Sequence, residues 1–234
     1  MKTTYALLLA LCAFVQYPCL ARAGQPTAVE LANKLNDEWE EIFYALPADQ
    51  QAARFKALLP RIRELQAKYP NQAEPLVIEA VTLCTLVAAE WSFSALSDIE
   101  KARELLLKSL AIDPGAMEGA AYIALGNLYY RLPGWPISFG DDETAQKYLE
   151  AAVKLYPDEV DANFFLGDYW LGEDDYEKAL TYLEKAEKAK IRPQHRLSDQ
   201  HTKTETLKAL EAARKHESAR SSFFSDIVPS FFKQ

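Results

Sequence analysis

Cysteine, glycine and the alternating apolar pattern of β-strands are scarce in this chain. Its 234 residues include 3 cysteines and 8 glycines. So few glycines, with no stretch rich in serine and glycine, argue against domains joined by a flexible linker. Apolar residues recur instead at helical spacing. The sequence therefore predicts one continuous all-α body.

The cysteines exclude a disulfide scaffold. Cys12 and Cys19 lie within the first 23 residues, and Cys84 is the only cysteine after them. A single thiol cannot form an internal disulfide. Cys84 lies in the apolar stretch from Val81 to Val87, so we interpret it as a small residue inside a buried helix.

Residue patterns typical of catalysis or metal binding are also lacking. The three histidines have no metal-ligand spacing with one another or with a cysteine, and we interpret them as surface residues: His195, His201 and His216. Acidic clusters at 141–143 and 173–175 lie where helix caps are needed, and no calcium-binding loop surrounds them. No nucleophile elbow, phosphate-binding glycine loop or pair of catalytic carboxylates is recognisable. We therefore expect no metal, no cofactor and no enzymatic activity.

The first 23 residues have the pattern of a secretory signal peptide. Lys2 precedes an apolar run from Tyr5 to Val15, and Ala21-Arg22-Ala23 forms a small-x-small exit. The run is shorter than the roughly 20 apolar residues that span a bilayer. Cleavage after Ala23 would change the formal net charge from −8 to −10, which disfavours nucleic acid and anionic lipid. We expect a periplasmic or secreted protein without nucleic-acid partners or stable membrane insertion.

Prolines mark a repeat along the rest of the chain. They end basic or alanine-rich amphipathic segments and are separated by 44, 43 and 36 residues: Pro70, Pro114, Pro157 and Pro193. A tetratricopeptide hairpin has about 34 residues. Ala102 and Ala145 each lie 12 residues before the next proline, so the second helices have standard length. The surplus residues must therefore lie earlier, near the turn between the two helices of a pair.

Two of these repeats share the same anchor residues. Leu125-Gly126, Tyr129, Ala145, Leu149 and Ala152 are matched by Leu166-Gly167, Trp170, Ala179, Leu183 and Ala186. Glycine on a first helix opposite alanine on a second helix lets the two backbones approach closely. We expect Gly126 to face Ala145, and Gly167 to face Ala179.

These signals predict a tetratricopeptide-like helical-hairpin solenoid. We expect four hairpins, over 27–70, 71–114, 115–157 and 158–193, and a polar C-terminal capping helix over 198–218. The repeat domain would span 24–220, followed by a phenylalanine-rich tail over 221–234. Capping-box spacing predicts helix starts at Ser97 with Glu100 and at Asp174 with Glu177, and Asp141 or Asp142 can cap the helix that carries Ala145.

The third hairpin contains an insertion rich in proline, glycine and aromatic residues, from Pro133 to Asp142. Trp135, Ile137 and Phe139 supply more apolar area than a solvated loop needs. In one interpretation Trp135 and Phe139 fold back and fill the seam beside the third hairpin. In the other they are rigid aromatic anchors for a protein partner.

The insertion and its flanks resemble a known family. Residues 125–142 read LGNLYYRLPGWPISFGDD and are followed by Ala145, Arg192-Pro193-Gln194-His195-Arg196 and Asp199. From about residue 70 to 210 the chain resembles a group of exported bacterial tetratricopeptide-repeat proteins, and this resemblance implies the fold without an assigned activity. A looser similarity is to the tetratricopeptide component that accompanies substrate-binding proteins of periplasmic tripartite transporters.

Three hypotheses for function follow. The leading one is a non-enzymatic scaffold or adaptor that binds a segment of another cell-envelope protein, through first-helix residues that we expect to line a groove: Tyr122, Asn127, Asn163 and Tyr169. The alternative is an accessory component of a periplasmic transport system that holds a small apolar ligand in a pocket or pore roofed by the insertion. In the third, the phenylalanine-rich tail packs into the protein's own groove until a partner displaces it.

Overall fold

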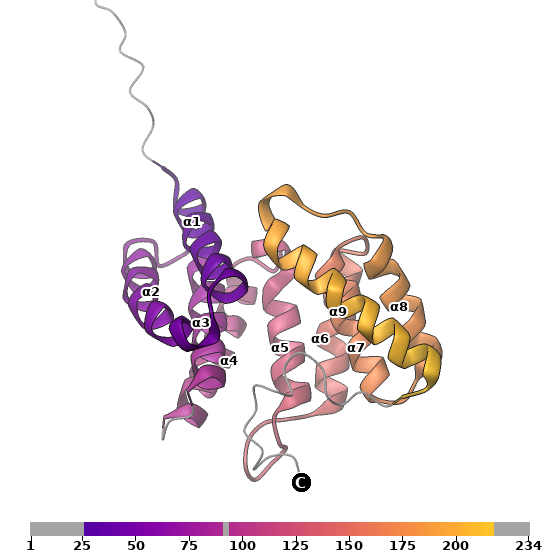
Figure 1. Cartoon of the computed structure of the whole chain (residues 1–234). Helices are drawn as coiled ribbons and strands as arrows, with labels where there is room; N and C mark the ends of the chain where they lie inside the picture. The colour runs from indigo at the N-terminus through magenta and orange to yellow at the C-terminus, as the bar shows by residue number, and fades with distance from the viewer. Residues whose placement is uncertain (1–25, 91–93, 218–234) are drawn as a thin grey trace, which may run out of the picture.

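The structure is a computed structural model that describes residues 26–90 and 94–217 (Figure 1). Over these residues it contains nine α-helices, three short helical segments and no strand, so the predicted all-α class is confirmed. The signal-like segment, the phenylalanine-rich tail and the surplus residues Trp91, Ser92 and Phe93 lie outside the described residues.

The helices follow one another with short connections. Their bounds are α1 (Ala28–Glu40), α2 (Ala48–Lys68), α3 (Glu74–Ala89), α4 (Ala95–Ile112), α5 (Ala120–Arg131), α6 (Asp142–Leu155), α7 (Val160–Gly172), α8 (Tyr176–Lys188) and α9 (Arg196–Lys215). A π-helical turn, η1 (Glu41–Ala45), continues α1. The 3₁₀ turns η2 (Ala116–Gly119) and η3 (Pro193–His195) precede α5 and α9.

Each helix packs against its neighbours in the chain. The pairs α1 with α2, α3 with α4, α5 with α6, and α7 with α8 are in contact, and each pair contacts the next. Each pair lies within one of the four ranges predicted from the sequence. The last helix, α9, packs on α7 and α8 as the final layer.

A glycine allows close packing within two of the pairs. A Cβ atom placed on Gly126 would lie 2.6 Å from Cγ of Leu149, and 3.3 Å from the carbonyl oxygen of Ala145. On Gly167 it would lie 2.7 Å from Cγ of Leu183. The predicted approach at Gly126 is confirmed. At Gly167 the nearest partner is Leu183, one turn beyond the predicted Ala179, because the leucine side chain fills the space that the glycine leaves.

The predicted cap of α6 is confirmed, and two other predicted caps are wrong. The Asp141 carboxylate accepts a hydrogen bond from the backbone N–H of Thr144 at 2.7 Å. For α8 the cap is Asp175 rather than Asp174, because Asp174 adopts a left-handed conformation with φ 58° and turns the chain before the helix begins. Ser97 lies inside α4, which begins at the buried Ala95 and has Ser94 as its N-cap.

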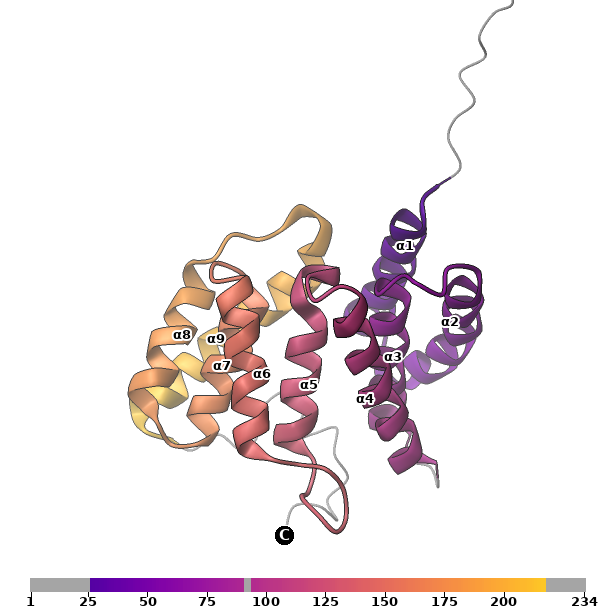
Figure 2. The same cartoon turned by 180° about the vertical axis from the view of Figure 1, so that it is seen from behind.

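The first and last parts of the chain meet. The helices α1 to α4 form one side of the molecule and α5 to α8 the other, as Figures 1 and 2 show. α9 runs obliquely along the second side, and its N-terminal part contacts η1 of the first side. The helical array therefore curls until its last helix touches its first pair, and this contact encloses the space described next.

Candidate functional site

A cavity of about 260 Å³ lies on the inner side of the curled array. Its lining comes mainly from α3, α5 and α9, with contributions from α4, α7, η1 and the end of α1. Most of the wall is apolar, and its side chains include Trp39, Phe43, Val87, Leu128, Phe164 and Phe165.

The sequences of α3 and α7 explain why so much apolar surface faces inward. Both helices are apolar on nearly every side, a pattern typical of helices surrounded by other elements. One face of α3 supplies core residues such as Leu76 and Leu83. Its remaining apolar residues, including Val81 and Val87, line the cavity.

Cys84 is part of this apolar wall. Burial raises the pKa of its thiol to about 12, so the thiol stays protonated at neutral pH. It therefore contributes apolar surface rather than a nucleophile. The prediction of a small residue in a helix of the interior agrees with this position, with the difference that one side of Cys84 borders open space.

Polar side chains reach the cavity from α7 and α9. Asp161 of α7 lies beside Thr202 of α9, whose hydroxyl donates a hydrogen bond to the carboxylate at 3.2 Å. Ser198, His201 and Glu205 of α9 also line the cavity. The cavity thus has an apolar wall facing a wall that can form hydrogen bonds.

Behind this polar wall, Arg192 forms ion pairs with four carboxylates, and we call this group the Arg192 cluster. Its Nη2 atom lies 2.6 Å from Asp161 and 2.5 Å from Asp199. Its Nη1 atom lies 2.5 Å from Glu118, and its Nε atom 3.2 Å from Glu159. The Arg192 side chain is 12% exposed and that of Asp199 is 0% exposed. One guanidinium therefore ties the segment before α9 to η2 and α7.

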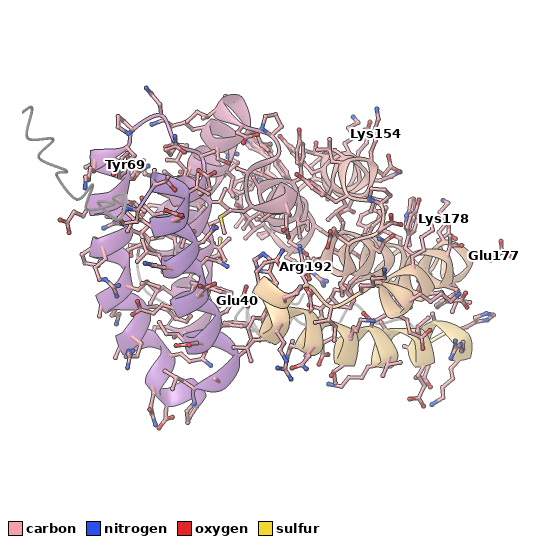
Figure 3. The ribbon with its side chains drawn as sticks, turned by 90° about the horizontal axis from the view of Figure 1, so that it is seen from above. Glu40, Tyr69, Lys154, Glu177, Lys178 and Arg192 are labelled. Carbon is pink, nitrogen blue, oxygen red and sulfur yellow. The ribbon has the colours of Figure 1, made fainter. Side chains whose placement is uncertain are left out.

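His195 extends the cluster to the first helix pair. Its Nδ1 atom lies 2.8 Å from Glu40 at the end of α1, and its Nε2 atom lies 3.4 Å from Glu118. Burial opposes protonation of His195, but the hydrogen bond with Glu40 and the charges of Glu40 and Glu118 together outweigh burial and raise the pKa of His195. Figure 3 shows Glu40 and Arg192 on the two sides of the molecule, close to each other. The contact between His195 and Glu40 helps hold the array closed.

The interpretation of His195 as a surface residue is wrong, because its side chain is 21% exposed. The side chain of His201 is 39% exposed, and its ring lies 5.1 Å from that of Tyr44 of η1. The reason is the contact between α9 and η1, which covers the N-terminal half of a helix that the sequence marks as polar. His216 is exposed and stacks on Tyr176 at 4.6 Å.

The Arg192 cluster carries excess negative charge. It contains the carboxylates of Glu40, Glu118, Glu159, Asp161 and Asp199, together with two basic groups. Burial raises the pKa values of Asp161 and Glu159, and the Arg192 charge opposes this rise. Because the carboxylates outnumber the basic groups, further positive charge near them would be favourable.

Of the four expected groove residues, Asn127 lines the cavity. Its side-chain amide donates to the carbonyl of Ile123 at 2.9 Å. Tyr122 lies half-buried beside Tyr148 of α6, with ring centroids 6.3 Å apart, and is not among the cavity-lining residues.

Asn163 and Tyr169 do not face a groove. Asn163 is fully buried and donates to the backbone carbonyls of Pro157 and Glu159. Tyr169 is 4% exposed and its hydroxyl lies 3.3 Å from the carbonyl oxygen of Asp142. Both lie on α7, which contacts α5, α6, α8 and α9. The interpretation of these two residues as groove residues is therefore wrong, because neighbouring helices cover α7.

The interpretation that Trp135 and Phe139 both fold back is right for Phe139 and wrong for Trp135. Phe139 folds back, with its ring 5.1 Å from that of Tyr129 and the Arg103 guanidinium 4.1 Å from its centroid. Trp135 is 90% exposed and Ile137 is 56% exposed. The loop projects beyond the ends of α5 and α6 (Figures 1 and 2).

Hydrogen bonds hold this loop in one shape. The backbone N–H of Gly140 donates to the carbonyl of Pro133 at 3.0 Å, and that of Asp141 to the carbonyl of Tyr129 at 2.9 Å. A Cβ atom on Gly140 would lie 1.8 Å from the carbonyl oxygen of Leu132, so the closed loop requires glycine there. Leu132 and Pro133, at its start, also line the cavity.

Sequence reasoning missed the contribution of η1 and the role of the Arg192 cluster. Trp39, Phe43 and Tyr44 supply one end of the cavity wall, and their aromatic density in residues 39–44 was the available signal. No local pattern pairs Glu40 with His195, which are 155 residues apart.

Within the described ranges, no helix is long and apolar enough to cross a membrane. The same residues contain no group of three or more histidine, cysteine or acidic side chains that could hold a metal ion. No known protein-family model matches the chain, and no curated protein matches it significantly.

Proposed function

We propose that the chain is an exported, non-enzymatic tetratricopeptide-type repeat protein that holds a small apolar ligand in its cavity. The apolar cavity on the inner side of the array is the observation that carries this proposal. The four helix pairs, the glycine contacts at Gly126 and Gly167, and the recurring prolines support the repeat class. The signal-like N-terminus supports export.

The closed shape favours a ligand over a peptide in a long groove. An open helical-repeat array offers its inner side to an extended segment of another protein. Here α9 covers α7, and the contact of α9 with η1 closes the inner side. The remaining space, about 260 Å³, is close to the lower end of the 300–1,000 Å³ range of small-molecule sites.

Filling the cavity tests this proposal. Ala124 of α5 lines the cavity and is partly buried, so Ala124→Phe would place a ring in the ligand space. We expect the variant to bind decanol at least about tenfold more weakly than the wild-type chain, which corresponds to about 1.4 kcal/mol. Isothermal titration calorimetry measures the affinity.

Ala57→Phe is the control, because Ala57 is exposed on α2 and α2 contributes nothing to the cavity lining. It should bind decanol like the wild-type chain, and thermal unfolding checks that both variants fold. Equal decanol binding by both variants would contradict the proposal. So would a wild-type chain that binds none of decanol, decylamine and decanoate.

The exposed loop supports a second candidate function, an adaptor for another envelope protein. Trp135 and Ile137 are presented on a loop that hydrogen bonds and the partly buried Phe139 fix in place. A rigid aromatic residue loses little conformational entropy on binding, and such residues dominate interface energies. Trp135 and Phe139 thus have different roles here: Trp135 contacts the partner, and Phe139 anchors the loop.

Site-specific photo-crosslinking in cells tests this adaptor function. A photoreactive amino acid at position 137 is expected to give a discrete product with one envelope protein, and Trp135→Ala should reduce that product at least about tenfold by removing the central contact. Leu207 of α9 is the control position, because it and Ile137 are both 56% exposed. Similar products from both positions, or a product at 137 that is insensitive to Trp135→Ala, would count against the adaptor.

A further inference from the structure

We infer that the cavity selects an amphiphile with a single apolar chain and a cationic, amine-type head group over an anionic one. This inference deepens the proposed ligand-holding function and rests on it. The cavity has an apolar wall for the chain and, on α7 and α9, polar groups for the head.

The charges that face the cavity favour a cation. Asp161 and Glu205 are the two carboxylates among the lining residues. Arg131 also lines the cavity, but it forms an ion pair with Asp168 at 2.5 Å, with the two side chains 11% and 5% exposed. Two carboxylates, Asp161 and Glu205, therefore line the cavity, whereas the charge of Arg131 is already neutralised by Asp168.

The charges behind the lining act in the same direction. The Arg192 cluster places five carboxylates against two basic groups next to Asp161. Its two basic groups are engaged with carboxylates inside the cluster, and Lys208, which pairs with Glu205 at 2.7 Å, is 67% exposed. An ammonium group near Asp161 would reduce the excess negative charge. The resulting gain in binding free energy is larger in the cavity than in bulk water, because charges interact more strongly there.

An anionic head group meets the opposite situation. A buried carboxylate needs hydrogen-bond donors or a cation to offset its lost hydration. Near the polar wall the donors of Arg192 and Thr202 already serve Asp161. A fatty acid would place its carboxylate beside Asp161 and Glu205, and like charges at short distance disfavour binding.

The other end of the cavity suits an apolar chain. Leu96, Leu132 and Pro133 line it, and Leu96 is 40% exposed, so this region borders solvent. A chain longer than the cavity would therefore reach solvent beside Leu96.

The test compares three ligands that share one apolar chain. Decylamine, decanol and decanoate are titrated into the full chain by calorimetry at neutral pH, each below its aggregation concentration. We expect decylamine to bind at least about tenfold more tightly than decanoate, with decanol between them. Decanoate binding as tightly as decylamine would overturn the inference while leaving the ligand-holding function intact. Failure of all three to bind would overturn both.

Glu205→Gln links the preference to the cavity. We expect it to reduce the ratio of decylamine to decanoate affinity by about threefold, because one lining carboxylate is removed. Glu211→Gln is the matched control, since Glu211 lies on the same helix and pairs with Lys215 at 2.6 Å outside the cavity. An unchanged ratio in Glu205→Gln, or an equal change in Glu211→Gln, would contradict the assignment of the head group to this wall.

Discussion

Replacing Arg192 by alanine is expected to lower the free energy of unfolding by about 3–5 kcal/mol at neutral pH. The change removes the cation shared by Glu118, Glu159, Asp161 and Asp199. Asp199 has no exposed side-chain surface, so water cannot replace the lost ion pair. Uncompensated buried charge, rather than the loss of one favourable contact, makes this effect large.

The loss should become smaller as the pH falls. Burial raises the folded-state pKa values of Asp161 and Glu159, and the Arg192 charge opposes this rise. Without Arg192 both pKa values rise further, so the folded variant binds protons that the unfolded chain releases, and its stability falls as the pH increases through the acidic range. At a pH below these pKa values, Asp161 and Glu159 are protonated, and their repulsion in the variant disappears. The wild-type chain loses its ion pairs with the same carboxylates, so the two proteins become more similar in stability.

Urea unfolding at neutral pH and at about pH 4 measures both effects. Arg196→Ala is the control, because Arg196 is exposed at the first position of α9, and we expect a change within about 0.5 kcal/mol. Arg192→Lys should recover part of the loss, since lysine keeps the charge but lacks the planar fork that holds several carboxylates. A loss below about 1 kcal/mol in Arg192→Ala would show that the cluster does not hold the fold together.

Leu149→Ala is expected to lower the free energy of unfolding by about 2–5 kcal/mol. Leu149 is 1% exposed and fills the space above Gly126, where an added Cβ atom would lie 2.6 Å from its Cγ atom. Truncation leaves a cavity between α5 and α6, and the loss should appear as a lower urea midpoint.

A double-mutant cycle gives this prediction a sharper form. Gly126→Ala alone adds helix propensity of about 0.5–1 kcal/mol but forces a methyl group against Leu149, at a cost of about 1–3 kcal/mol. Combined with Leu149→Ala, the new methyl group enters the space left by the leucine, so the double variant should be more stable than the sum of the single changes. Leu155→Ala, on the same helix and 49% exposed, is the control and should change stability by less than about 0.5 kcal/mol. Strict additivity of the two core changes would contradict the contact.

Patterns carried by neighbouring residues were predictable from the sequence. Helical spacing and the prolines located the four helix pairs. The close approach of α5 and α6 was predictable because Gly126 and Ala145 are small and recur as Gly167 and Ala179 in the next helix pair. The aspartate cap at Asp141 was predictable for the same reason: capping depends on a side chain and the next three residues. The predicted cap of α8 was one residue too early, because Asp174 adopts a left-handed conformation. The sequence shows only that an aspartate can adopt that conformation.

The candidate site depended on contacts between distant segments and was largely unpredictable. Asn163 and Tyr169 were placed on the correct helix but assigned to an open face, because the sequence does not show that α9 packs back on α7. The contact between α9 and η1, which the sequence does not show either, brings Glu40 beside His195 and Tyr44 beside His201. Trp135 and Phe139 could not be separated either, since their opposite orientations depend on the position of Tyr129 and Arg103.

The contact between α9 and η1 has a consequence for how this architecture can evolve. In an open helical-repeat array, units can be gained or lost because each contacts only its neighbours. Here Glu40 and His195 meet only if the intervening pairs turn the chain through a fixed total rotation. One inserted or deleted hairpin would carry α9 past η1 or leave it short, and would open the cavity. The number of helix pairs in such a fold is therefore fixed by closure, as the number of blades is in a propeller, rather than free to vary.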